Sequence, residues 1–207
     1  LNLLLGCSFS HIGKIQESIG YLEVAKQISP DKSWQKSWAL HYLGNNYFAL
    51  QQYEKSKGSF EESIALNASK EMVKDAKRSL LILGFDSYYA NWKTVETEHF
   101  IFHFQDGFSG NIDDFVMKRE KAFIEINTFF ETILTKKIDF FVWHSTKDAQ
   151  NKLKIGLGFS IPSLCIIHSH YSQTVGHELT HVFANNSVKI EQATRFIDEG
   201  IAVCFDQ

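Results

Sequence analysis

The chain has 207 residues, of which 44% are hydrophobic and 22% are charged, and its formal net charge is −3. These values exclude a disordered chain, a collagen-like chain and a strongly basic nucleic-acid binder, so no nucleic-acid partner is expected. Three cysteines are too few for a disulfide framework and indicate no redox compartment. No run of about 18 apolar residues occurs, which predicts no transmembrane segment.

Histidine and phenylalanine are distributed unevenly along the chain. Seven of the 9 histidines and fourteen of the 18 phenylalanines follow residue 91. The chain therefore divides into two compositional halves, and metal or acid–base chemistry is expected in the histidine-rich second half.

The first half contains an internal repeat that begins at Gly6 and again at Gly44. Small residues recur at the same offsets with bulky residues between them, as two closely packed antiparallel helices require. The matched positions are Leu5, Gly6, Phe9, Gly13, Ser18, Leu22, Ala25 and Pro30 in the first copy, and Leu43, Gly44, Tyr47, Gln51, Ser56, Phe60, Ser63 and Ala68 in the second. The pattern resembles the tetratricopeptide repeat family, whose unit has about 34 residues. We assign residues 1–69 to such helical repeats, with a period of 38 here.

Residues 70–93 are expected to form a capping helix and a linker, with a degenerate third repeat as the alternative. The helix is predicted from Lys70 to about Ala90. Because solenoid repeats expose a concave face that binds other proteins, a protein partner is expected on the repeat face. The segment from Leu4 to Cys7 also resembles the end of a lipoprotein signal, but the basic and long apolar regions of such a signal are missing.

The second half begins with an alternating segment from Thr94 to Phe104 that predicts a β-strand. Its phenylalanines share one face, and His99 and His103 are expected on the outer face. A helix from about Asp114 to Thr132, capped by Asp113 or Asp114, should follow. Its predicted apolar stripe consists of Phe115, Ala122, Ile126, Phe129 and Ile133.

Two further strands are predicted, from Lys137 to His144 and from Ser163 to His168. A strand–helix–strand–strand order implies a small mixed sheet with a helix packed on it. The predicted fold class is α+β: helical repeat hairpins followed by a domain in residues 94–207 that has a small mixed sheet and further helices.

The segment from His177 to His181 reads His-Glu-Leu-Thr-His. Two histidines four residues apart project from one face of a helix, so both can reach one zinc ion at about 2.0–2.1 Å. This is the HExxH motif, in which Glu178 lies where it can hold a water molecule at the metal. An apolar side is predicted for this helix, with Ser172 or Thr174 as its cap, and consists of Val175, Leu179, Val182 and Phe183.

A catalytic zinc ion needs a third protein ligand, and the segment Phe196–Ala202 contains Asp-Glu-Gly-x-Ala. Seventeen residues separate His181 from Glu199. Together the two motifs resemble the gluzincin family of zinc metallopeptidases, in its aminopeptidase-like form. The resemblance implies one zinc ion held by His177, His181 and Glu199, with Glu178 as the general base that activates a water molecule for peptide hydrolysis.

The resemblance also implies roles for neighbouring residues. Gly200 would let the helix backbone pass close to its neighbour. Asp198 either orients a ligand histidine through a hydrogen bond or caps the helix. The strand with Cys165, Ile166 and Ile167 would be the sheet edge that pairs with an extended substrate.

Gluzincins add a Tyr or His that stabilises the oxyanion. We expect that residue beyond residue 207, with His168, His170 or Tyr171 as alternatives. Cys204 is expected to be a buried free thiol. The chain begins with Leu1, and we expect it to be a fragment cut at both ends, with a C-terminally truncated peptidase domain.

The favoured function is therefore a zinc metallopeptidase that acts on a peptide or protein substrate and carries a protein-binding repeat module. The alternative is an adaptor or scaffold protein whose metal site is inactive or structural. The intact Glu178 favours the enzyme, because a purely structural site has no use for a base. Substrate identity, endo- or exopeptidase action, localisation and oligomeric state stay open.

Overall fold

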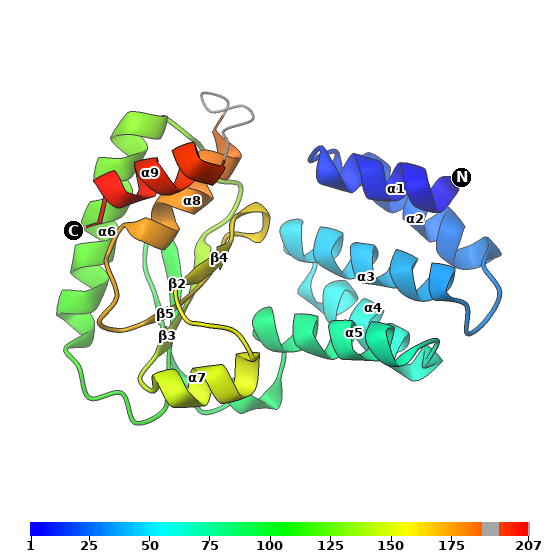
Figure 1. Ribbon diagram of the computed structural model, residues 1–207, viewed down its shortest axis with the longest axis horizontal. Helices are drawn as coiled ribbons and strands as arrows, with labels where there is room; N and C mark the ends of the chain where they lie inside the picture. Colours follow the sequence, from blue (N-terminus) through cyan, green and yellow to red (C-terminus); the bar gives the residue numbers. More distant parts are fainter. Residues whose placement is uncertain (188–194, 207) are drawn as a thin grey trace. The chain divides into compact units, whose positions relative to one another are not determined.

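The computed structural model describes residues 1–187 and 195–206. Within these ranges the chain forms nine α-helices and one five-stranded sheet (Figure 1). The α+β class and the mixed sheet predicted from the sequence are confirmed. The chain divides into two compact units, Leu1–Ser87 and Tyr88–Gln207, so the boundary falls inside the segment expected to be a linker.

The first unit is entirely helical. Consecutive helices pack against each other, and the first helices of successive pairs also touch. Its helices are α1 (Asn2–His11), α2 (Ile15–Ile28), α3 (Trp34–Ala49), α4 (Tyr53–Leu66) and α5 (Lys70–Ile82). The Ser33 and Ser69 side chains cap α3 and α5 by accepting hydrogen bonds from backbone amides three residues on.

Helix α5 is shorter than predicted, because it ends at Ile82 rather than near Ala90. Gly84 takes a φ of +80°, and the amide of Phe85 donates back to the Leu80 carbonyl. This left-handed glycine turn ends the helix. A short 3₁₀ helix, η1 (Ser87–Tyr89), follows it.

The two helix pairs repeat the same contacts 38 residues apart. The Ser18 hydroxyl donates to the Gly6 carbonyl at 2.7 Å, and the Ser56 hydroxyl donates to the Gly44 carbonyl at the same distance. A Cβ added to either glycine would collide with a bulky side chain of the following helix, Leu22 or Phe60. Small residues therefore let each pair of helices pack closely.

The second unit is built on a sheet with strand order β1-β2-β3-β5-β4. The central pairs β2–β3 and β3–β5 are parallel, and the outer pairs β1–β2 and β4–β5 are antiparallel. The strands are β1 (Lys93–Glu96), β2 (Phe100–Phe104), β3 (Ile138–Trp143), β4 (Phe159–Ile161) and β5 (Ile166–His170). The other elements of this unit are α6 (Ile112–Phe130), α7 (Thr146–Leu153), η2 (Pro162–Leu164), α8 (His177–Asn186) and α9 (Arg195–Cys204).

Several sequence predictions for this unit were wrong in detail. The segment 94–104 is two antiparallel strands joined at Thr97, whose amide donates to the Phe100 carbonyl. Helix α6 is capped by the Asn111 side chain, not by an aspartate. Helix α7 and strand β4 were not predicted, because each is too short to give a clear periodic signal.

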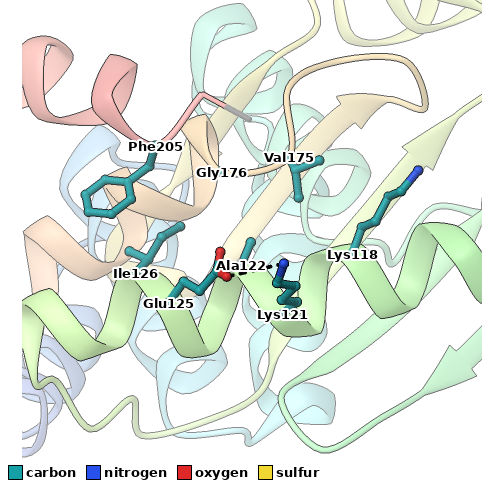
Figure 2. Close-up of a pocket in the computed structure, with 8 residues that line it drawn as sticks. All are labelled: Lys118, Lys121, Ala122, Glu125, Ile126, Val175, Gly176 and Phe205. Atoms are coloured by element: carbon teal, nitrogen blue, oxygen red, sulfur yellow. Dashed lines mark ion pairs between the residues drawn. The ribbon is translucent and has the colours of Figure 1, made fainter.

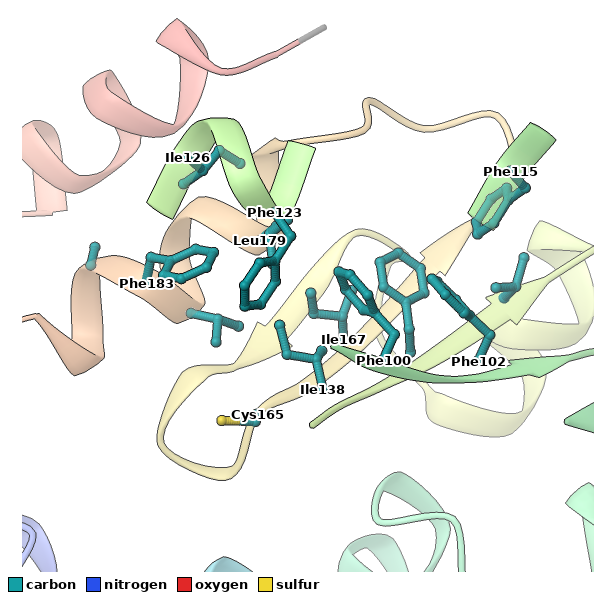
Figure 3. Close-up of a cluster of buried hydrophobic side chains, with 14 of the residues drawn as sticks. Phe100, Phe102, Phe115, Phe123, Ile126, Ile138, Cys165, Ile167, Leu179 and Phe183 are labelled. Carbon is teal, nitrogen blue, oxygen red and sulfur yellow. The ribbon is translucent and has the colours of Figure 1, made fainter. Parts of the chain in front are cut away.

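One face of the sheet is covered by α6 and α8 (Figure 3). The phenylalanines of β2 all point into this core, as predicted. There Phe100 meets Phe123 of α6, which in turn meets Phe183 of α8. Phe129 and Ile133 were predicted to join the apolar stripe but are exposed. Helix α6 ends at Phe130 in a left-handed residue, Glu131, so the stripe does not continue past that point.

The opposite face of the sheet carries a second group of aromatic side chains. Trp143 of β3 meets Trp92 edge-on with ring centroids 4.9 Å apart, and Phe141 lies 5.0 Å from Tyr89. The sheet is therefore buried on both faces, as expected for strands that pair in parallel. No helix within the described residues is long and apolar enough to span a membrane.

Candidate metal centre

Helix α8 carries the HExxH motif and is anchored by its apolar side. Leu179, Val182 and Phe183 are fully or almost fully buried, as the sequence predicted. Neither Ser172 nor Thr174 caps the helix: Gly176 occupies the N-cap position without a side-chain hydrogen bond. The Ser172 hydroxyl instead lies 2.7 Å from Nδ1 of His170.

Helix α9 packs on α8 and brings the second motif to the histidines. The close backbone approach occurs at Gly176, where an added Cβ would overlap the carbonyl oxygen of Phe205. This close backbone approach was predicted from the sequence at Gly200, and that prediction was wrong. A Cβ on Gly200 would meet no described atom within 4 Å.

Gly176 and Phe205 also border a cavity of about 310 Å³ beside α6 (Figure 2). Ile126, Val175 and Phe205 supply apolar walls. Lys118 lines it too, and Lys121 and Glu125 form a 3.5 Å ion pair within its lining. The Gly176 backbone thus lies both at the contact with Phe205 and in the wall of this cavity.

His177, His181 and Glu199 come together as the two motifs predicted. The Nε2 atom of His177 lies 3.5 Å from Oε2 of Glu199, and the Nε2 atom of His181 lies 3.7 Å from the same oxygen. One ligand atom from each residue lies within 4.8 Å of the others. Among the described residues, no other group of three His, Cys, Asp or Glu side chains meets this criterion.

The chemistry of these donors fits a divalent metal ion. Two imidazole nitrogens and one carboxylate oxygen form a set that zinc accepts in catalytic sites and that other first-row ions also accept. The Glu199 side chain is 46% exposed, so solvent reaches the group. Three protein ligands on an open face leave a coordination position for water or substrate.

A carboxylate lies next to the Nδ1 atom of each of these two histidines. Oδ2 of Asp198 is 3.1 Å from Nδ1 of His181, and Oδ1 of Asp206 is 3.5 Å from Nδ1 of His177. Asp198 lies inside α9 rather than at its N-cap, and its carboxylate contacts His181, as one of its two predicted roles requires. Such contacts fix the imidazole orientation and leave Nε2 to face the metal position.

Asp206 was not identified from the sequence. It lies beyond the end of α9 at Cys204, so helical spacing from Glu199 does not indicate it. The backbone leaves α9 after Cys204, and a turn at Phe205 carries the aspartate to His177.

Glu178 lies in a partly buried position beside the two histidines. Burial raises its pKa, and the charge of Glu199 acts in the same direction. A hydrogen bond with the Ser160 side chain and the two ligand histidines oppose this, but the net pKa remains raised. A carboxyl group with a pKa moved toward neutrality is suited to exchange protons with a substrate or water.

The predicted substrate edge, Cys165 with Ile166 and Ile167, was wrong. Strand β5 pairs with β3 on one side and with β4 on the other, so it lies inside the sheet. Cys165 precedes it in a left-handed turn, and burial raises the pKa of its thiol to about 11. The edge of the described sheet beside the metal centre is β4, which contains Ser160.

The remaining histidines of this unit have structural partners. His168 is fully buried, stacks on Phe141 and Phe159, and accepts a hydrogen bond from the Trp143 indole at 3.1 Å. His170 uses one nitrogen for Ser172 and the other for the His144 carbonyl. Neither ring is therefore free to stabilise an oxyanion.

His99 and His103 are half-buried and not on an open outer face. Nδ1 of His99 lies 2.6 Å from the Glu120 carboxylate, and Nε2 of His103 lies 3.2 Å from Asp139. Cys204 was predicted to be buried, but it is exposed, with its thiol donating to the Gly200 carbonyl. Helix α9 turns this position toward solvent.

Comparison with known proteins assigns the chain to no family. No family model matches it, and no curated protein or solved structure matches it either. The candidate metal centre is therefore supported by its own geometry and donor chemistry.

Proposed function

We propose that the chain is a zinc-dependent metallopeptidase of the gluzincin type. The observation that carries the proposal is the meeting of His177, His181 and Glu199 around one point, with the carboxylate of Glu178 beside them. A purely structural zinc site is closed by four protein ligands and needs no adjacent base. Three ligands, an open face and a base correspond to a hydrolytic site.

Each residue of the site has a distinct task in this mechanism. Glu178 accepts a proton from the attacking water and delivers it to the leaving amine. Asp198 and Asp206 hold the two imidazoles so that their Nε2 atoms face the metal position. A bound zinc ion would supply a lowered pKa for its water molecule and polarisation of the scissile carbonyl.

Strand β4 is the element that we propose for substrate binding. It lies at a sheet edge, and its Ser160 contacts the general base Glu178. An extended peptide that adds to this edge by backbone hydrogen bonds would pass directly beside the base. The substrate class is thus an extended peptide, held mainly through its backbone.

The helical unit is proposed to be a repeat module of the tetratricopeptide type. Its support is the recurrence of the glycine–serine hydrogen bond and of the glycine–bulky residue contact after 38 residues. A module of this kind would bring a partner or a substrate to the peptidase.

The test compares Glu178→Gln with the wild type after zinc loading. The glutamine variant should retain about one zinc ion per chain, because Glu178 is not a ligand, and should lose at least about 100-fold in hydrolysis of a mixed peptide pool. Glu98→Gln, at an exposed glutamate of the same unit, is the control and should remain active.

Two outcomes would overturn the proposal. Equal hydrolysis by wild type and Glu178→Gln would remove the base from the mechanism. A wild-type chain that binds zinc but cleaves no peptide would favour the scaffold function with an inactive metal site.

A further inference from the structure

The helical unit contains a second cavity, of about 300 Å³, that belongs to neither the metal centre nor its cavity. This volume is at the lower end of the range for ligand pockets. Its lining comes from α1, α3 and α5, the first helices of successive pairs, and consists of His11, Trp38, His41, Tyr42, Asn45, Met72 and Asp75.

The charge of this cavity is negative at neutral pH. Asp75 is the only carboxylate in the lining, and no lysine or arginine lines it. In residues 1–187 and 195–206, no lysine or arginine forms an ion pair with Asp75. Burial lowers the pKa of His41, although Asp75 opposes this, so His41 does not neutralise the carboxylate at neutral pH.

Aromatic side chains share the lining with Asp75. Trp38 is 40% exposed, although a tryptophan is usually well buried, and Trp34 meets it edge-on at 6.2 Å. The rings of Tyr42 and His11 lie 5.6 Å apart in the same lining. Indole and phenol faces attract cations through their quadrupoles, and the Asp75 carboxylate adds a charge of the opposite sign in the same lining.

Asn45 adds a neutral polar group to the lining. Among the described residues, no hydrogen bond involves its half-buried side-chain amide. A primary amide both donates and accepts, as does a peptide group in an extended chain, so the two can pair. A small organic cation would leave this amide unused, whereas a peptide would engage it.

We propose that this cavity binds an arginine side chain of an extended peptide segment in a partner protein. Asp75 pairs with the guanidinium, Trp38 and Tyr42 contact its plane, and Asn45 bonds the peptide backbone next to it. Arginine fits better than lysine, because its planar fork both stacks on aromatic rings and pairs with a carboxylate through two hydrogen bonds.

The test uses two peptides that differ in one charge, acetyl-Leu-Arg-Leu-amide and the same peptide with citrulline. Citrulline keeps the planar shape of arginine and removes its positive charge. Binding to the full chain is followed by NMR through the shift of the Trp38 indole N–H. The arginine peptide should bind at least about tenfold more tightly than the citrulline peptide, as expected for a charge held against a carboxylate and aromatic rings.

Two variants on α5 make the test specific. Asp75→Asn should reduce the affinity for the arginine peptide to the level of the citrulline peptide. The affinity for the citrulline peptide should stay unchanged. Glu71→Gln removes a charge one turn earlier, outside the cavity, and should change neither. Equal affinities of the wild type for both peptides, or no shift of the Trp38 signal at millimolar peptide, would overturn the proposal, as would equal effects of the two variants.

Discussion

Nδ1 of His181 lies 3.1 Å from Oδ2 of Asp198, while Nε2 of the same ring lies 3.7 Å from Oε2 of Glu199. Two adjacent residues of α9 therefore contact opposite nitrogens of one imidazole on α8. An imidazole whose Nδ1–H is donated to a carboxylate keeps Nε2 unprotonated, and that is the form that binds a metal.

Asp198→Asn should weaken zinc binding by about 10–100-fold without unfolding the chain, because the amide still occupies the space but no longer strengthens His181 as a ligand. Competition with a coloured zinc chelator measures this affinity. Asp206→Asn is the matched variant, and its effect should be smaller, because its carboxylate lies 3.5 Å from His177. Unchanged affinity in Asp198→Asn would remove this aspartate from the metal centre.

Gly176→Ala should destabilise the second unit and weaken metal binding. Its Cβ would overlap the Phe205 carbonyl oxygen, so α9 must shift away from α8, at a cost of about 1–3 kcal/mol. Gly200→Ala is the control: its Cβ meets no described atom, and alanine in a helix should raise the free energy of unfolding by about 0.5–1 kcal/mol. Urea unfolding of the zinc-free chain measures both, and equal effects would contradict the close approach at Gly176.

The sequence predicts those site residues whose positions follow from regular spacing along a helix. His177, His181 and Glu199 were identified because helix periodicity and motif form place them. Asp206 and Ser160 were missed, since one needs a turn after α9 and the other needs a strand that the sequence does not reveal. Contacts of this kind arise from chain reversals and not from local spacing.

In the fold, too, features set by local periodicity were predicted and features set by long-range pairing were not. The buried phenylalanines of β2 and the apolar side of α8 follow simple periodicities and were predicted correctly. Strand order was not predictable, because it depends on which strands lie side by side across the sheet. The resemblance to gluzincins implied that Ile166 and Ile167 lie at a sheet edge, but β4 pairs beyond them.

Gly44→Ala tests the close packing in the helical unit. Its Cβ would lie 2.5 Å from Cζ of Phe60, in a side chain that is fully buried and has no room to move. We expect a loss of about 1–3 kcal/mol in the free energy of unfolding. Gly58→Ala on α4 has open space around its Cβ and should instead be stabilising by about 0.5–1 kcal/mol. A Gly44→Ala chain as stable as Gly58→Ala, in urea melts followed by circular dichroism, would contradict the packing.

A buried ion pair makes the second unit sensitive to acid. Asp139 accepts from the Lys136 ammonium at 2.8 Å and lies 3.2 Å from His103. Burial raises the Asp139 pKa, but these two partners outweigh it, and the net pKa is lowered. Because the folded pKa is below the unfolded value of about 3.9, the carboxylate stabilises the fold above about pH 4, and this is lost as the pH falls through the folded pKa.

Asp139→Asn should therefore cost about 3 kcal/mol at pH 7, since the Lys136 ammonium remains buried without this carboxylate charge. The difference from wild type should shrink as the pH falls below about 4. Glu125→Gln, which removes an exposed pair with Lys121, is the control and should cost less than about 1 kcal/mol at any pH. Urea unfolding across this pH range is the measurement, and a pH-independent difference for Asp139→Asn would contradict the ion pair.

The most direct test of the metal centre is a calorimetric zinc titration of the wild-type chain and of Glu199→Ala. The account predicts one zinc ion per wild-type chain, and at least about tenfold weaker binding in the variant, because a ligand is lost from a three-residue set. A wild-type chain that binds no stoichiometric zinc, or a Glu199→Ala chain that binds it equally well, would contradict the account.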